Sequence, residues 1–419
     1  METFGSLGIL SSFEEKLSSR SIVVPTSVQR QVIPLLLAGK NIIFRSATGT
    51  GKTFAYLLPA IQNLAASQAP DANTGKRPYY EGPMALILAP TLELCSQIKA
   101  EIDFLSPFNS ALLIGSTRVE RQIESLKKSR PLIAVGNPGR LLLLAKMGKI
   151  KLKNIAFLIL DEADRFASTD CLDETRQLLA LIEQGIRSKN AKDGKEPLSG
   201  FCFTACSATV TAKTRALLGS FFESAKLVEN DEHEILRQRI EHWALFSEYR
   251  QKIQTLRSLL AALKVNKPGF KVLIFAASGE QSAKILSRLQ YHNIKACGLI
   301  GKVNKKAFTS QERKAALDSF RSGKINVLVS TDLAARGLDI TGLTHIISMD
   351  VPEDGDTYIH RAGRTGRAGK KGVMISIGDE HEMRRLVLLE KRLKIMVRPK
   401  ELYYGRICSP ADINSEHVK

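Results

Sequence analysis

The sequence has few cysteines, no long apolar run and no repetitive tail, and each absence excludes a class of protein. Six cysteines scattered over 419 residues are too few for a disulfide framework. No stretch approaches the ~18 apolar residues of a membrane-spanning helix, and no cationic segment precedes an apolar run at the N-terminus. Neither a solenoid-type repeat nor an Arg-Gly-rich tail is present. We therefore expect a soluble protein of a reducing compartment, a bacterial cytoplasm or, in a eukaryote, also the nucleus.

The remaining composition is that of a globular protein with a strong positive charge. Hydrophobic residues make up 44% and charged residues 25% of the chain, which leaves ample apolar surface to bury. At roughly 150 residues per domain, the length suggests about two or three domains. Lys and Arg number 61 against 42 Asp and Glu, a formal charge of +19. A net positive charge of this size attracts polyanions. The candidate partners are therefore nucleic acid, nucleotide phosphates or an anionic membrane.

Short apolar runs alternate with amphipathic stretches in both halves of the chain. The first half contains NIIF, ALIL, PLIAVG, AFLIL and FCFTAC, and the second contains KVLIF, KACGLI, NVLVS, HIISM and GVMISIG. This order predicts βαβ units in an α/β fold, with two mostly parallel, doubly wound sheets flanked by helices. We expect one domain over residues 1–230, a polar linker at 231–240 and a second domain over 241–419. The polar stretches 68–82 and 187–200 are typical of surface loops.

A phosphate-binding loop is the first strong chemical signal. The segment SATGTGKT follows a predicted strand and precedes a predicted helix. Glycines there allow backbone N–H groups to approach phosphate oxygens, Lys52 can reach the β- and γ-phosphates, and Thr53 can ligate Mg²⁺. A glycine-rich turn without function is the alternative, which the strand–loop–helix context disfavours. The predicted nucleotide-binding residues of this loop are Ser46, Ala47, Thr48, Gly49, Thr50, Gly51, Lys52 and Thr53.

Acidic residues follow the strand AFLIL, where ligands bind at the carboxyl edge of a parallel sheet. Asp161 can hold Mg²⁺, and Glu162 can orient and deprotonate a water that attacks the γ-phosphate. In the second half, HRAGRTGR spaces Arg361, Arg364 and Arg367 three residues apart. On one side of a helix, these arginines can reach phosphates held by the other domain. A solvated basic face is the alternative interpretation of this octamer.

Taken in order and across nearly the whole chain, these motifs resemble those of the DEAD-box ATP-dependent RNA helicases. The resemblance implies two RecA-like domains that close around ATP and a single RNA strand, bending the strand so that a short duplex separates. It also implies ATP and Mg²⁺ as cofactors, RNA bound mostly through its backbone, and protein partners that select the substrate. We expect no membrane partner, and the lack of coiled-coil heptads favours a monomer.

The resemblance also assigns roles around the nucleotide. VVPTSVQ is similar to the Q motif, with Gln29 reading adenine and Phe4 as the upstream aromatic, while Ile22 replaces the family's usual adenine-stacking aromatic. In STDLAARGLD, Gly337 and Asp339 are expected to contact the nucleotide. We expect the coupling between the nucleotide site and the RNA site to involve the Ser207-Ala208-Thr209 segment, Asp164 and Arg336. The implied catalytic residues are Lys52, Asp161, Glu162, His360, Arg364 and Arg367.

Turns in both halves resemble the family's RNA-binding elements. The implied RNA contacts are Pro90, Thr91, Gly115, Pro138, Gly139, Arg140, Arg313, Thr331 and Arg361. Three positions depart from the family pattern: Leu92 replaces an Arg, Asn137 a Thr and Ser310 a Gln. The segment before the helix at Ser310 is longer than usual, and its lysines, Lys302, Lys305 and Lys306, either supply replacement phosphate contacts or are simply solvated.

Four functions compete at this point. An RNA-dependent ATPase that unwinds short duplexes or remodels RNA–protein complexes accounts for every motif. An RNA clamp or assembly scaffold, whose ATPase only times release, is the second reading, favoured by the departures at Leu92, Asn137 and Ser310. A DNA helicase shares the phosphate loop but not the Q motif or the DEAD tetrad. A small-molecule kinase or transport ATPase leaves the second half and the positive charge unexplained.

Overall fold

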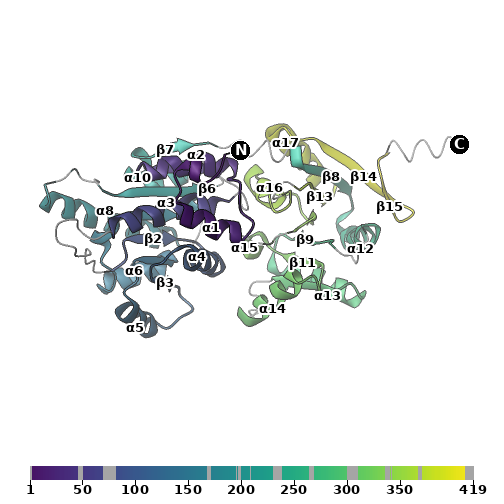
Figure 1. Ribbon diagram of the computed structural model, residues 1–419. Helices are drawn as coiled ribbons and strands as arrows, with labels where there is room; N and C mark the ends of the chain where they lie inside the picture. Colours follow the sequence, from purple (N-terminus) through teal and green to yellow (C-terminus); the bar gives the residue numbers. More distant parts are fainter. Residues whose placement is uncertain are drawn as a thin grey trace. The chain divides into compact units, whose positions relative to one another are not determined.

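The computed structural model divides the chain into two compact units, Met1–Asn230 and Asp231–Lys419 (Figure 1). It describes residues 2–45, 51–68, 82–167, 171–194, 196, 200–207, 209–229, 238–263, 269–299, 310–335, 340, 342–366 and 370–410. Each unit contains one sheet of mainly parallel strands with helices on both faces. The predicted α/β class is therefore confirmed, and each unit is described by itself below.

The first unit is built on a seven-stranded parallel sheet with the strand order β3-β4-β2-β5-β6-β1-β7. Each of the strands β1 to β6 is followed by at least one helix that crosses back to the next parallel strand, as parallel neighbours require. The elements are η1 (Gly5–Leu7), α1 (Ser11–Ser19), α2 (Ser27–Leu37), β1 (Ile42–Arg45), α3 (Lys52–Ser67), β2 (Ala85–Leu88), α4 (Leu92–Leu105), β3 (Ser110–Leu113), α5 (Val119–Ser129), β4 (Ile133–Gly136), α6 (Pro138–Lys146), η2 (Leu152–Asn154), β5 (Phe157–Leu160), α7 (Ala163–Phe166), α8 (Leu172–Lys192), β6 (Cys202–Ser207), α9 (Ala212–Leu218), α10 (Ser220–Glu223) and β7 (Lys226–Val228).

Strand side chains of the first unit alternate between two hydrophobic clusters. Ile42 and Phe44 of β1 pack with α1, α2, α3 and α4, whereas Ile43 packs on the other face with α5, α6, α8 and α9. The central strands are buried on both faces. Their sequences are therefore continuous runs of apolar residues and do not alternate between apolar and polar residues. Burial on both faces fixes the strand register, and with it the position of every residue that follows a strand.

The second unit has an eight-stranded sheet in the order β10-β11-β9-β12-β13-β8-β14-β15, in which β15 alone is antiparallel to its neighbour. Helices α12 and α13 cover one face, and α14, α15, α16 and α17 the other. The elements are β8 (Ile240–Phe246), η3 (Tyr249–Gln251), α12 (Lys252–Ala262), β9 (Val272–Phe275), α13 (Gly279–Tyr291), β10 (Ala296–Leu299), α14 (Ser310–Arg321), β11 (Val327–Ser330), α15 (Asp332–Ala335), β12 (His345–Ser348), α16 (Gly355–Ala362), β13 (Gly372–Gly378), α17 (Glu380–Leu393), β14 (Val397–Tyr403) and β15 (Arg406–Cys408).

Two local expectations are wrong. The polar stretch 187–200 does not begin as a loop, because α8 continues to Lys192 with Ile186 and Asn190 buried, and the Asn190 amide donates to the carbonyl of Glu196 at 3.1 Å. The arginines of HRAGRTGR do not share one helix, because α16 ends at Ala362 and Arg364 lies beyond it. Of the stretch 68–82, residues 69–81 lie outside the described residues.

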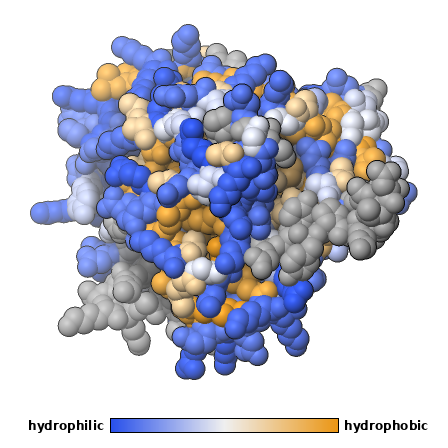
Figure 2. All heavy atoms as spheres, turned by 90° about the vertical axis from the view of Figure 1, so that its left-hand side faces the viewer, coloured by the Kyte–Doolittle hydropathy of each residue, from blue (hydrophilic) through white to orange (hydrophobic). Residues whose placement is uncertain are grey.

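The surface and the thiols agree with the composition. In the view of Figure 2, most side chains are hydrophilic, and hydrophobic ones form smaller patches between them. All six cysteines are free, and Cys202 and Cys206 are buried. Within the described part of the chain, no group of His, Cys, Asp and Glu side chains could form a metal cluster. No helix among those residues is long and apolar enough to cross a membrane.

Candidate nucleotide and nucleic-acid sites

The order of strands in the first unit brings the predicted site residues to one edge of the sheet. Because all strands are parallel, their carboxyl ends meet at that edge. Along the chain, β1 is followed by the phosphate loop, β6 by the Ser-Ala-Thr segment and β5 by the DEAD tetrad, Asp161-Glu162-Ala163-Asp164. These three strands are neighbours in the sheet. The neighbours β2, β4 and β3 end next to the three turns predicted to bind RNA. Two groups of residues, one for nucleotide and one for RNA, thus lie side by side.

A buried cation and two buried carboxylates form the centre of the nucleotide group. Lys52 is the first residue of α3, and its Nζ lies 2.9 Å from Asp161 Oδ1 and 3.9 Å from Glu162 Oε1. All three side chains are less than one-tenth exposed. Burial alone would lower the pKa of Lys52, but the charges of Asp161 and Glu162 and the hydrogen bond to Asp161 act together with other nearby groups to raise it. Lys52 is therefore a protonated ammonium group at this site.

Asp161 is held at both carboxylate oxygens. Besides Lys52, the Cys206 thiol donates to Oδ1 at 2.8 Å and the Tyr56 hydroxyl donates to Oδ2 at 2.8 Å. Burial would raise the pKa of Asp161, but the charge of Lys52 and these hydrogen bonds together lower it. Burial, then the charge of Asp161, raises the pKa of both Cys206 and Tyr56. The carboxylate is thus ionised, and its two neutral donors keep their protons.

Glu162 has an unusual backbone and a carboxylate oxygen without a partner. Its φ is 55° and its ψ 52°, the left-handed region that few non-glycine residues occupy. Strained conformations of this kind cluster at functional sites, where the surrounding fold maintains them. Its Oε2 is buried and accepts no hydrogen bond from the described residues. A buried acceptor that no described residue reaches with a donor is suited to a water molecule, as expected for a general base.

Gln29 connects the Q motif to the phosphate loop. Its backbone N–H and side-chain oxygen form a capping box with Thr26 at the start of α2. Its Nε2 donates to the carbonyl of Gly51 at 2.9 Å. A Cβ at Gly51 would lie 2.5 Å from that nitrogen, and Gly51 has a φ of +86°. The glycine is therefore required both by the turn and by the approach of Gln29.

The two hydrophobic residues predicted near adenine occupy different environments. Phe4 is fully buried in the core that α1, α2 and α3 share with the sheet. Ile22 is only partly buried and packs against the same core. The aliphatic residue thus occupies the position, just before Gln29, where the resemblance predicts an aromatic ring.

The Ser-Ala-Thr segment is tied to Asp164 by two hydrogen bonds, and a third closes the segment on itself. The Asp164 amide donates to Ser207 Oγ at 3.1 Å, and the Ser207 hydroxyl donates to the carbonyl of Thr209 at 2.6 Å. The Thr209 hydroxyl donates to Asp164 Oδ2 at 3.3 Å. A shift of β6 would therefore be transmitted to α7 and to Glu162.

Two of the turns predicted to bind RNA are helix N-termini. Thr91 caps α4 by accepting from the Leu94 amide at 3.2 Å, and Asn137 caps α6 by accepting from the Arg140 amide at 3.3 Å. Helix N-termini favour anions, because their first N–H groups lack partners within the helix. Asn137 thus keeps the capping role of the Thr it replaces, whereas Leu92 packs partly buried against the hydrophobic core.

Arg140 joins the turns that follow β3 and β4. Its guanidinium donates to the carbonyls of Thr117 at 2.7 Å and Gly115 at 3.1 Å, and to Gln122 Oε1 at 3.0 Å. Gln122 in turn donates to the carbonyl of Ile114 at 2.9 Å. Arg140 therefore organises the Gly115 turn, and these contacts use most of its donors.

Arg361, which the resemblance predicts to bind RNA, lies in the interior of the second unit. Only 2% of the residue is exposed. Its guanidinium donates to both oxygens of Asp332 at 2.8 and 2.6 Å, to Asp350 Oδ2 at 3.0 Å, to the carbonyl of Asp350 at 2.9 Å, and to the Ser348 hydroxyl. Burial would lower the pKa of Arg361, but Asp332 above all raises it. These contacts assign Arg361 to the support of the Thr331 turn.

The other predicted residues of the second unit are placed as follows. Thr331 accepts from the Ala334 amide at 3.3 Å at the start of α15. Arg364 is buried, His360 is partly buried at the end of α16, and Arg313 lies on α14. Predicted residues that lie outside the described part of the chain are Ser46, Ala47, Thr48, Gly49, Thr50, Ala208, Lys302, Lys305, Lys306, Arg336, Gly337, Asp339 and Arg367.

Sequence patterns did not identify four residues that contact the predicted site residues: Tyr56, Cys206, Asp332 and Asp350. Tyr56 follows Lys52 by one helical turn, so spacing along the helix could have placed it beside the lysine. Cys206 directly precedes Ser207, at the end of the apolar run FCFTAC. Asp332 and Asp350 follow β11 and β12, and the same rule that selects Asp161 could have found them.

The side chains fit a magnesium ion that is shared with a nucleotide. Asp161 offers a buried carboxylate, and Thr53 offers a hydroxyl one residue after Lys52. Mg²⁺ prefers oxygen ligands and is bound by one or two protein groups together with substrate phosphates, not by a full protein cage.

A buried lysine between an ionised aspartate and a glutamate, at the carboxyl edge of a RecA-like sheet, defines an ATP-hydrolysing motor. Comparisons with known proteins agree. The DEAD/DEAH box helicase family model matches residues 26–217, and the helicase conserved C-terminal domain matches residues 251–369. The chain belongs to the DEAD-box ATP-dependent RNA helicases.

Individual relatives span nearly the whole chain. It is 32% identical to the DEAD-box ATP-dependent RNA helicase CshC of Bacillus cereus, over 91% of this chain and 88% of that protein. It is 31% identical to the probable ATP-dependent RNA helicase YfmL of Bacillus subtilis, over 92% and 93% respectively. The structure of S. cerevisiae Dbp5 bound to RNA and ADP BeF3 superposes with a TM-score of 0.75 at 24% identity, covering 95% of this chain and 96% of that one, and shows the shared fold.

Proposed function

We propose that this chain is an RNA-dependent ATPase that unwinds short RNA duplexes or remodels RNA–protein complexes. The observation that carries the proposal is the arrangement along one edge of the first sheet. There the Lys52–Asp161–Glu162 cluster adjoins the three turns predicted to bind RNA. The residues proposed for hydrolysis and those proposed to bind RNA phosphates thus follow strands of the same sheet.

In the proposed reaction, Gln29 recognises adenine and Lys52 turns from Asp161 to the β- and γ-phosphates of ATP. Thr53 and Asp161 would hold Mg²⁺, which supplies charge neutralisation at the phosphates when bound. Glu162 orients a water at its unpartnered Oε2 and accepts its proton. Nucleotide binding thus removes the cation that neutralises Asp161, and the released carboxylate becomes available as a ligand.

RNA dependence is proposed to follow from closure of the two units. Arg364 and Arg367 would reach the γ-phosphate only when RNA is held by both units, with Gly337 and Asp339 at the nucleotide. The first unit would grip RNA phosphates through Pro90, Thr91, Gly115, Pro138 and Gly139. Thr331 and Arg313 would do so in the second unit, and His360 and Arg336 would couple the sites. Such contacts to the backbone carry no sequence information.

A clamp with little unwinding remains the second candidate, because Leu92 packs against the core where the family has a cation. Separation of a short duplex under single-turnover conditions distinguishes the two functions. We further propose a monomer that works in the cytoplasm, and that partner proteins select its RNA.

Glu162→Gln tests the proposal directly, since it keeps the size of the side chain and removes its basicity. RNA-stimulated turnover is expected to fall by about 10²- to 10⁴-fold, the range for removal of a general base. Binding of ATP and RNA is expected to persist. Turnover at the wild-type rate would remove Glu162 from its proposed role, and with it this account of hydrolysis.

A further inference from the structure

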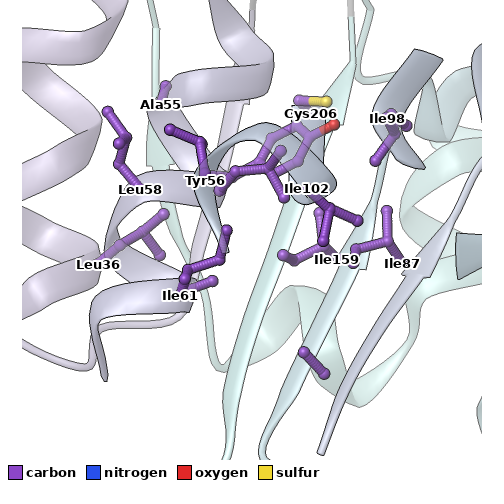
Figure 3. Packing of buried hydrophobic residues seen from close by; sticks show 14 of the residues in the cluster. Leu36, Ala55, Tyr56, Leu58, Ile61, Ile87, Ile98, Ile102, Ile159 and Cys206 are labelled. Carbon is purple, nitrogen blue, oxygen red and sulfur yellow. The ribbon is translucent and has the colours of Figure 1, made fainter. Parts of the chain in front are cut away.

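The carboxylate of Asp161 is fixed by two neutral donors in addition to Lys52. The Tyr56 hydroxyl and the Cys206 thiol each lie 2.8 Å from a different oxygen of that carboxylate, and both residues are fully buried. Figure 3 shows the Tyr56 ring extending from α3 with its hydroxyl end beside Cys206 of β6. Ile87, Ile98 and other apolar residues surround the pair. Neither donor has a role in the reaction proposed above.

Tyr56 also links the two predicted magnesium ligands. It lies three residues after Thr53 on the same face of α3. Its hydroxyl donates to Asp161, which follows β5. Tyr56 therefore ties Asp161 to the helical turn that carries Thr53.

Cys206 connects Asp161 to the coupling segment. It is the penultimate residue of β6, and the next residue, Ser207, accepts the Asp164 amide. The thiol shares Asp161 Oδ1 with Lys52, at 2.8 and 2.9 Å. If Lys52 turns to the phosphates, Cys206 remains on Oδ1 and Tyr56 on Oδ2. Because both are neutral, they hold the carboxylate in place without cancelling the charge that attracts a cation.

We propose that Tyr56 and Cys206 are positioning residues that orient Asp161 and Thr53 for the magnesium ion that accompanies ATP. This inference rests on the proposed function. Partners of this kind, which orient metal ligands by hydrogen bonds, typically contribute 10- to 100-fold to metal affinity or activity. The two residues should therefore control how strongly Mg²⁺ and nucleotide binding reinforce each other.

The test measures binding of a non-hydrolysable ATP analogue to the full chain, in Mg²⁺ and in EDTA. The ratio of the two dissociation constants reports the coupling between metal and nucleotide, independently of turnover. We expect Tyr56→Phe and Cys206→Ala each to lower this ratio about tenfold, with little change in EDTA. Cys206→Ser, which keeps a donor, should retain most of it.

Cys202→Ala is the matched control, because it removes a buried thiol from the same strand without touching Asp161. It should leave the ratio unchanged. An unchanged ratio in both Tyr56→Phe and Cys206→Ala overturns the inference. So does an equal loss in Cys206→Ser and Cys206→Ala, because packing alone would then explain it. If Cys206→Ala melts early by circular dichroism, Tyr56→Phe, which removes a single oxygen atom, decides the question.

The wild type separates this inference from the proposed function. A wild-type chain whose affinity for the analogue is the same in Mg²⁺ and in EDTA contradicts the magnesium-dependent ATPase itself. A wild-type chain with a large ratio, together with unchanged variants, contradicts only the roles of Tyr56 and Cys206.

Discussion

Replacing Arg361 should destabilise the second unit by several kcal/mol. The guanidinium is buried and pairs with two carboxylates, Asp332 and Asp350. Removing one member of a buried ion pair typically costs about 3–5 kcal/mol, because the remaining charge is left uncompensated. Arg361→Ala leaves two like charges close together, so we expect a loss of unfolding free energy in this range at pH 7.

The loss should depend on pH. Burial raises the pKa of Asp350 above its ordinary value, and Arg361 opposes that rise. Without Arg361, the pKa of Asp350 rises further, and the folded state then binds a proton that the unfolded state releases. Stability of the variant should therefore increase as the pH falls from 7 toward the Asp350 pKa, so the difference from the wild type should be smaller at pH 5 than at pH 7.

The single tryptophan makes this measurable for one unit at a time. Trp243 lies on β8 of the second unit, so its fluorescence during urea denaturation follows that unit. Arg384→Ala is the control, since the Arg384–Glu380 pair is exposed; its effect should stay within about 0.5 kcal/mol. A loss below about 1 kcal/mol for Arg361→Ala would refute the buried network and return Arg361 to a direct contact with RNA.

Three further predictions concern single positions. Leu92→Arg should strengthen RNA binding and steepen its dependence on log salt by about 0.7, the contribution of one phosphate contact on a single strand; an unchanged slope in RNA-binding titrations would mean that position 92 does not face RNA. Asn137→Ala should cost about 1 kcal/mol through loss of the α6 cap, whereas Asn137→Thr should cost little, and equal losses in chemical denaturation would contradict the capping role. Burial lowers the pKa of His345 to about 4, so the second unit should lose stability as the pH falls from 6.5 toward 4. His345→Gln should remove that part of the Trp243-monitored pH dependence, and an identical pH profile would show that His345 is not its source.

The sheets and the catalytic cluster could be predicted because strong local patterns encode them. Strands buried on both faces are continuous apolar runs, and the glycine-rich loop and the DEAD tetrad follow two of them directly. The strands at one end of the second sheet were harder to predict: β8, β14 and β15 are partly exposed, so no apolar run marks them.

Partners that come together only in the folded chain could not be predicted. The sequence separates Tyr56 from Asp161 by 105 positions and Cys206 from Asp161 by 45, and no spacing rule connects them. The contacts of Arg361 with Asp332 and Asp350 likewise join residues far apart in the sequence, and the spacing of the arginine-rich motif does not indicate them.

The central claim is that RNA switches on ATP hydrolysis. Steady-state hydrolysis should be measured without nucleic acid, with single-stranded RNA, and with single-stranded DNA of the same sequence. The account predicts strong stimulation by RNA and little by DNA, since the 2′-hydroxyl distinguishes the two strands. Equal stimulation by DNA would indicate a DNA motor, and a rate that neither strand changes would contradict RNA-dependent hydrolysis by this chain.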